Sequence, residues 1–261
     1  MHRIIVALSV TLLLAACGIS AIPTTSGTPQ SEVVVQATAA PAPTAAPKPT
    51  TTPKPTEAPK PTATPAPTAT PEPEKLKLLD SGFGQNKQVI GYAFLVENPN
   101  KGLAYGSSQY HVSVYSADGT VLGTDSNYIA VIFPGEKLGV SGRLYLNSEA
   151  KAEKIEVQIL GGKTKTFKET QGFGTDKVTF APDPYSPKVA GIVTSSYTKD
   201  IKQVYVAAIA YDQAGKIIGG GFTFLDFVPA AGKTAVEVGV TVSDDPAKVE
   251  LYPTFSELSL Q

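Results

Sequence analysis

The chain after residue 74 contains one pattern twice, at an offset of about 90 to 100 residues, and this duplication constrains the fold most strongly. The matching segments occur in the same order in both copies. They are 82–87 and 172–177, 89–93 and 189–193, 115–123 and 211–219, 133–137 and 228–233, and 154–157 and 248–251. We therefore expect two homologous domains, at residues 75–168 and 169–261.

Both copies have the alternation of apolar and polar residues that is typical of β-strands with one buried face. The apolar positions include Tyr110, Val112, Val114, Leu138, Val140, Leu144 and Leu146 in the first copy and Val206, Ala208, Ala210, Val236, Val238, Val240 and Val242 in the second. The Asp118-Gly119 step predicts a tight hairpin turn. Between strands, Gly219, Gly220 and Gly221 indicate a bulge or an edge kink.

Short strands separated by turns, without an amphipathic helix, favour an all-β fold. We expect two tandem immunoglobulin-like antiparallel β-sandwich domains. A copy of this size can bury a modest core without cross-links. The chain has no Trp and one Cys, so the buried Trp and disulfide of antibody domains are excluded, and the likeness to immunoglobulins is architectural.

Residues 17–74 are rich in Pro, Thr and Ala, and proline recurs every few residues in the second half of this segment. Proline fixes φ and removes the backbone donor, so neither a helix nor a sheet can propagate here. The composition predicts a disordered tether between the N-terminus and the two domains.

Residues 1–16 have a basic start, an apolar stretch from Ile4 to Leu14 and small residues at the end, which is the pattern of a signal peptide too short to span a bilayer. The sequence Leu14-Ala15-Ala16-Cys17 resembles the lipobox of bacterial lipoproteins. This resemblance implies cleavage before Cys17 and attachment of lipid to its thiol. The expected location is the cell membrane, lipid-anchored and extracytoplasmic, either periplasmic or at the cell surface. The alternative is an ordinary secretory signal with a coincidental cysteine.

The strand from residue 76 to 84, the turn Glu97-Asn98-Pro99-Asn100, the segment 117–123 and Pro134-Gly135-Glu136 together resemble the FxLYD domain of many bacterial lipoproteins. They are also similar to the immunoglobulin-like domain of the late embryogenesis abundant type 2, or water-stress, family. The second copy contains the Tyr211-Asp212 pair that the FxLYD name expects. The resemblance implies non-catalytic modules on an envelope protein.

Few residues are candidates for catalysis or metal binding. Past the signal peptide the chain has one histidine, His111, which alternation places on the polar face of a strand. Zinc needs three or four converging ligands, which one histidine and no free thiol do not supply. Calcium stays open at Asp183, Asp244 and Asp245, although turn formation also explains these residues. We expect no enzyme activity, no cofactor and no metal.

Basic and acidic residues are nearly balanced, at 22 and 23, without a basic cluster, so nucleic acid is not an expected partner. Tyrosine is favoured at recognition surfaces, but it also has a high strand propensity. The tyrosines that could serve either role are Tyr105, Tyr110, Tyr128, Tyr145, Tyr185, Tyr197 and Tyr205.

Three functions follow from these observations. The first is a lipid-anchored envelope protein whose two β-sandwich modules bind a protein or glycan partner outside the cytoplasm. The alternative is a structural spacer or envelope-stabilising protein without a specific ligand. A hydrolase is a more distant possibility, which would need a deep pocket with convergent polar groups.

Overall fold

The computed structural model describes residues 72–167 and 172–260. The expected signal peptide, Leu14, Ala15, Ala16 and Cys17, the tether up to residue 71 and the expected boundary between residues 168 and 169 lie outside this part of the chain. In the described ranges, no helix is long and apolar enough to cross a membrane.

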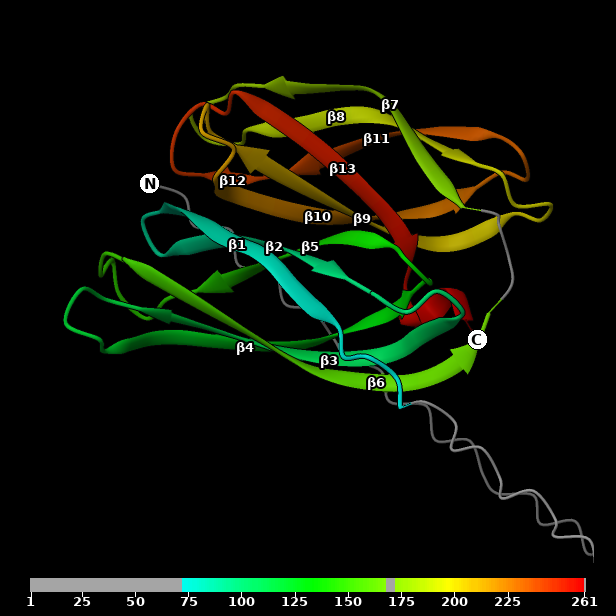
Figure 1. The fold of residues 1–261 in the computed structure, drawn as a ribbon. Coiled ribbons are helices and arrows are strands. Elements are labelled where there is room, and N and C mark those ends of the chain that lie inside the picture. The colour runs from blue at the N-terminus through cyan, green and yellow to red at the C-terminus, as the bar shows by residue number, and fades with distance from the viewer. Residues whose placement is uncertain (1–71, 168–171, 261) are drawn as a thin grey trace, which may run out of the picture. The chain divides into compact units, whose positions relative to one another are not determined.

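The first copy is a sandwich of two antiparallel three-stranded sheets (Figure 1). Its strands are β1 (Lys77–Asn86), β2 (Val89–Glu97), β3 (Leu103–Tyr115), β4 (Val121–Ile132), β5 (Lys137–Tyr145) and β6 (Lys154–Thr166). One sheet has the order β1-β2-β5 and the other β4-β3-β6. The inner faces supply the core, which includes Ile90, Tyr92, Phe94, Val112, Val114 and Leu138.

The second copy repeats this arrangement. Its strands are β7 (Phe173–Ala181), β8 (Lys188–Ser195), β9 (Ile201–Tyr211), β10 (Ile217–Val228), β11 (Lys233–Gly239), β12 (Thr241–Val242) and β13 (Lys248–Phe255), followed by a 3-10 helix, η1 (Glu257–Leu260). The sheets have the orders β11-β8-β7 and β12-β10-β9-β13. Val189, Val193, Val204, Val206, Val236 and Val238 are in its core. The predicted all-β chain with antiparallel sandwich domains is confirmed.

The turns recur along with the strand order. Gly119 and Gly215 adopt φ of 85° and 80° at the tips of equivalent hairpins, where a side chain on an L-residue would be strained. Before each tip the same backbone bond closes the turn, from Ser116 N–H to the Thr120 carbonyl and from Asp212 N–H to the Lys216 carbonyl, at 3.0 Å. The Asp118-Gly119 hairpin prediction therefore describes both copies.

Two of the sequence matches are out of register. The Asn98 N–H donates to the Glu136 carbonyl, and the Ser195 N–H donates to the Gly232 carbonyl at the same place in the second copy. Asn98 and Ser195 are therefore equivalent. Counting back along β2 and β8 from this pair, Tyr92 is equivalent to Val189.

Phe83 is opposite Tyr92 in the ladder and Phe180 is opposite Val189, so Phe180, not Phe173, is the counterpart of Phe83. The connection between β7 and β8 is longer than the connection between β1 and β2. The matches made from the sequence alone for residues 82–93 are therefore wrong by odd numbers of residues, which places inward-facing residues of one copy opposite outward-facing residues of the other.

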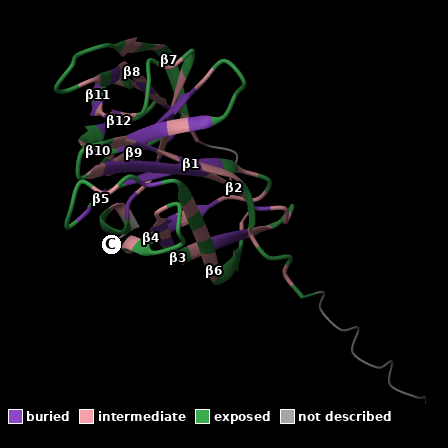
Figure 2. Cartoon of the chain, turned by 90° about the vertical axis from the view of Figure 1, so that its left-hand side faces the viewer, coloured by how far each residue is buried: buried purple, intermediate pink, exposed green. Residues whose placement is uncertain are grey.

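The two sandwiches belong to one compact unit and stack through their sheets (Figures 1 and 2). Sheet β1-β2-β5 lies against β10 and β9 of the second copy. Ala93, Ile209, Tyr211 and Ile217 form a buried cluster at this contact, with Leu95 and Tyr252 packed on it. Within these middle layers, buried residues, purple in Figure 2, predominate in β2, β5 and β9.

Glycine allows the two middle sheets to approach closely. A Cβ on Gly91 would lie 2.5 Å from the Gly220 carbonyl oxygen, and one on Gly82 would overlap the Ile217 carbonyl. A Cβ on Gly220 would be 2.9 Å from the Ala93 Cβ. The contact between the sandwiches therefore explains Gly220, whereas a Cβ on Gly219 or Gly221 would meet the backbone of residues 239–242 in the second sandwich itself. The three glycines lie inside β10 and not between strands as the sequence predicted, because each of them pairs with β9. The register of β10 shifts between Ile217 and Gly219, so the predicted bulge is found directly before them.

Hydrogen bonds join the same sheets. The Ser141 N–H donates to the Tyr205 hydroxyl at 3.1 Å, and this hydroxyl donates to the Ser141 carbonyl at 2.5 Å. The Ser141 hydroxyl donates to the Gly221 carbonyl. Backbone groups of β5 and β10 that the stacking would otherwise leave without water therefore have partners.

The first sandwich makes the contact through its β1-β2-β5 sheet, whereas the second makes it through the sheet that contains β9 and β10. The two copies therefore bury sheets that are not equivalent. On β9, Ala207 and Ile209 are buried in the contact, whereas their counterparts on β3, His111 and Ser113, lie on the outer face of the first sandwich. His111 is exposed, as its alternation predicts. The polar outer face of β3 therefore ends the stack of sandwiches, in the way that a terminal repeat with a polar outer face ends a solenoid protein.

Gly91→Ala tests the close approach of the sheets. We expect it to lower the free energy of unfolding by about 1–3 kcal/mol, because the added methyl group must displace backbone across the contact. Gly102→Ala is the matched control, since a Cβ there meets nothing within 4 Å. Urea unfolding followed by circular dichroism measures both variants. Equal stability of the two would contradict the close packing at Gly91.

Candidate functional site

A cavity of about 390 Å³, here called the aromatic cleft, opens where both copies meet. The first sandwich contributes residues of β2, β3, β4 and β5, and the second contributes residues of β9, β10, β13 and η1. Lining side chains include Tyr92, Tyr110, Asp125, Tyr128, Tyr205, Phe222, Phe224 and Leu258. Neither sandwich alone supplies all its walls.

The rim of the cleft is aromatic. Phe222 and Phe224 continue the face of β10 that packs on the first sandwich, but they are 38% and 48% exposed. The Tyr205 ring stacks on Phe222, with centroids 5.6 Å apart, and meets Phe224 edge to face at 5.7 Å. Tyr128 and Leu258 are exposed across the opening. Large apolar side chains grouped in this way are typical of a recognition surface.

The floor of the cleft is polar. The Tyr92 hydroxyl donates to the Asp125 carboxylate at 2.5 Å and lies 3.3 Å from the Tyr110 hydroxyl. Asp125 Oδ1 also accepts the Ser126 N–H at 2.8 Å. The sheet alternation turns Tyr92 and Tyr110 into the first core, and Asp125 meets them at the open edge between β4 and β5.

Burial keeps these phenols protonated. It raises the pKa of Tyr92 far above its ordinary value, and the neighbouring Tyr110 and Asp125 act in the same direction. Burial also raises the pKa of Tyr110, and it raises the pKa of Tyr205 to about 12. Tyr92 and Tyr110 are buried beneath the floor and hold the Asp125 carboxylate in place. Asp125 is half-buried, so the floor offers one carboxylate beneath apolar walls, an arrangement suited to orienting a ligand that has both polar and apolar parts.

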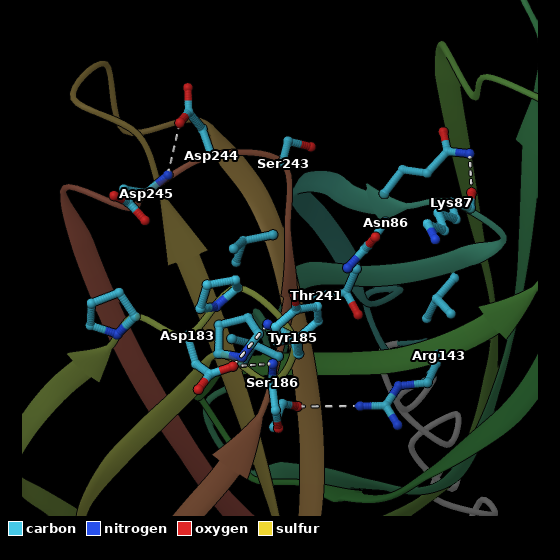
Figure 3. A pocket seen from close by; sticks show the side chains of 18 of the residues that line it. Asn86, Lys87, Arg143, Asp183, Tyr185, Ser186, Thr241, Ser243, Asp244 and Asp245 are labelled. Carbon is cyan, nitrogen blue, oxygen red and sulfur yellow. Dashed lines mark hydrogen bonds between the residues drawn. The ribbon is translucent and has the colours of Figure 1, made fainter.

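A second hollow, here called the loop groove, has a volume of about 1040 Å³ and shares Arg143 with the lining of the aromatic cleft. Figure 3 shows this groove from close by. The hairpin at residues 85–89 and the end of β5 form one part of its lining, and the loops at 182–187 and 239–245 form the rest. Tyr145 and Tyr185 are 68% and 93% exposed there. Both copies again contribute.

The aspartates considered for calcium all line this groove. Asp183 Oδ1 accepts the N–H groups of Tyr185 and Ser186, both at 2.8 Å, and these bonds hold the pKa of its carboxyl below the ordinary value. Asp244 Oδ1 accepts the Asp245 N–H at 3.0 Å. Among residues 72–167 and 172–260, no three His, Cys, Asp or Glu side chains are grouped to hold a metal ion. Turn formation accounts for Asp183 and Asp244, and the calcium hypothesis gains no support.

The tyrosines divide between core and surface. Tyr105, Tyr110 and Tyr197 are buried, and Tyr205 is half-buried at the contact between the sandwiches. Tyr128 lines the aromatic cleft, whereas Tyr145 and Tyr185 line the loop groove. Phe222 and Phe224 were not among the residues that the sequence predicted at a site. Their alternation directly after the three glycines was a signal for an aromatic continuation of a closely packed face.

Comparisons with known proteins leave the family open. No family model matches the chain. No curated protein matches it. Among solved structures, a β-glucuronidase from glycoside hydrolase family 2 is similar at 12% sequence identity and a TM-score of 0.21, covering 62% of this chain. The match covers 21% of the β-glucuronidase chain. A likeness this weak carries no argument about function.

The buried phenols predict a loss of stability at alkaline pH. Unfolded tyrosines ionise near pH 10, whereas Tyr92 and Tyr110 stay protonated when folded, so stability falls as pH rises above about 10. Each such phenol contributes a slope of up to about 1.4 kcal/mol per pH unit. Tyr92→Phe should reduce the slope of stability against pH by the contribution of one phenol. Urea unfolding of the variant and the wild type between about pH 9 and 11 measures this slope. Identical slopes for the variant and the wild type would contradict the burial of an ionisable group at position 92.

Proposed function

We propose that this protein is a lipid-anchored component of the cell envelope, whose two non-catalytic β-sandwich modules bind a protein or glycan partner outside the cytoplasm. Cys17 carries the lipid, the tether holds the modules away from the membrane, and the aromatic cleft receives the partner. The observation that carries the binding role is the exposed Phe222 and Phe224 pair above a polar floor.

The energetics of the cleft favour binding. An exposed phenylalanine loses apolar surface to the partner, at roughly 25 cal/mol per Å² of area removed from water. The rings are already held in contact with Tyr205, so little side-chain entropy remains to be lost. The Asp125 carboxylate, which the buried Tyr92 hydroxyl holds in place, can then orient the polar part of a ligand.

The spacer alternative is favoured by a different surface. The outer face of β3 presents polar residues such as His111 and Ser113. A polar surface of this kind is all that a protein without a specific ligand requires. A spacer gains nothing from phenylalanines that are half exposed on β10. We therefore rank the binding role first.

Cys17→Ala tests the anchor. We expect the variant to leave the membrane fraction, because a single cysteine would carry all of the attached acyl chains, each buried CH2 of which contributes about 0.8 kcal/mol. Ser20→Ala, three residues further on, is the control and should remain with the membrane. Mass spectrometry of the wild-type protein from membranes should find the lipid on residue 17. An unmodified thiol there would contradict the anchor.

Phe224→Ala tests the cleft. The full-length protein is cross-linked in the envelope and then extracted in mild detergent. When Phe222 or Phe224 is replaced by alanine, less partner should be recovered in cross-linked form with the protein than with the wild type. A central aromatic contact contributes about 2 kcal/mol or more at an interface. Phe227→Ala is the matched control, since Phe227 is on the same strand and 49% exposed but does not line the cleft. Equal recovery by all variants would place binding elsewhere and count against the cleft.

A further inference from the structure

The loop at residues 182–187 is an insertion relative to the first copy. In the first sandwich, only Lys87 and Gln88 separate β1 from β2, whereas six residues separate β7 from β8. Three of the six are prolines, which fix φ, and the Asp183 carboxylate holds two of the remaining amides. The insertion is therefore a braced loop.

This loop presents Tyr185 almost entirely to solvent, at 93% exposure. The core gains nothing from a ring in that position. Because the backbone beneath it is already ordered, binding through Tyr185 would cost little further loop entropy. Tyr145, from the other copy, is the second ring of the groove and is 68% exposed. A braced loop and two exposed rings on one groove are features that folding does not require.

The charge of the groove selects against anions. Its lining contains four carboxylates, on Glu149, Asp183, Asp244 and Asp245. The two cations are Lys87 and Arg143, and the Arg143 guanidinium already donates to the Gly239 carbonyl at 3.5 Å. Figure 3 shows the three aspartates and both cations around the opening. A polyanionic ligand would meet a net negative surface.

We propose that the loop groove binds an uncharged polysaccharide chain, made of neutral or N-acetylated amino sugars. This inference rests on the proposed binding role and names the ligand of a second site, whose lining shares only Arg143 with the aromatic cleft. The tyrosine rings would stack on the C–H faces of sugar rings, whose hydroxyl groups would donate to carboxylates such as Asp244 and Asp245. The amide side chains of Asn86 and Gln88 add donors and acceptors along the same groove.

A polysaccharide fits this groove better than a polypeptide does. Protein hot spots lie in desolvated pockets surrounded by contacts that exclude water. At 93% exposure, Tyr185 has almost no neighbouring side chains of this protein that could form such a surrounding rim. A sugar chain tolerates such a wet site, because bridging water can complete its hydrogen bonds.

Isothermal titration calorimetry of the full-length protein tests the proposal with two probes, chitohexaose as the uncharged sugar chain and heparin hexasaccharide as the anionic one. We expect chitohexaose to bind and heparin not to bind. Tyr185→Ala and Tyr145→Ala should each weaken chitohexaose binding about tenfold, equivalent to about 1.4 kcal/mol. Phe227→Ala, an exposed aromatic outside both hollows, should bind like the wild type.

Absence of chitohexaose binding, preferential binding of heparin, or equal binding by wild type and both tyrosine variants would overturn the proposal. If Tyr185→Ala instead lowered recovery of a cross-linked polypeptide, the groove would be a protein site, which also overturns it. Loss of partner recovery in Phe224→Ala tests the aromatic cleft independently, so the failure of one site is distinguishable from the failure of the other.

Discussion

The close contact between sheet β1-β2-β5 and strands β9 and β10 is the interaction on which the rest of the structure depends. It uses glycine and alanine where most sandwiches carry larger side chains, and a Cβ at Gly91 or Gly82 would reach the opposite backbone. Small residues allow the sheets to meet at short range, and the Ser141 and Tyr205 hydrogen bonds satisfy groups that the contact removes from water. Two domains that could have been independent thus become one packed body.

Both candidate sites are products of this contact. The aromatic cleft takes Asp125 and Tyr128 from the first sandwich and Phe222 and Phe224 from the second. The loop groove likewise combines Tyr145 with the braced loop of the second copy. Since each site has walls from both sandwiches, a change in their relative placement would alter both sites together. The duplication therefore produced two hollows lined by both copies, in addition to a second copy of the fold.

The sequence predicted the sandwiches because alternation and turn chemistry are local properties. The Asp118-Gly119 hairpin and the bulge at the glycines of β10 follow from the conformations that glycine permits. The packing of one copy on the other could not be predicted in this way, because it depends on which outer face is apolar. The contrast between His111 and Ala207 was visible in the sequence, but without the register it indicated only a difference between copies.

The sites were less predictable than the fold. Tyr185 and Tyr145 were among the candidate tyrosines, yet alternation cannot tell whether a ring at a strand end lies in the core or over a groove. Phe222 and Phe224 read as core residues by type, and they are partly exposed because they line the cleft between the two sandwiches. An error of an odd number of residues in the alignment of β2 with β8 exchanged inner and outer faces, which hid the role of Gly91.

Differential scanning calorimetry of the full-length protein tests the central claim most directly, namely that the two sandwiches form one packed body. If they do, they unfold together in a single transition whose calorimetric enthalpy equals its van't Hoff enthalpy. Two separate transitions, each with the enthalpy of one sandwich, would contradict the account and leave the aromatic cleft and the loop groove without a fixed geometry.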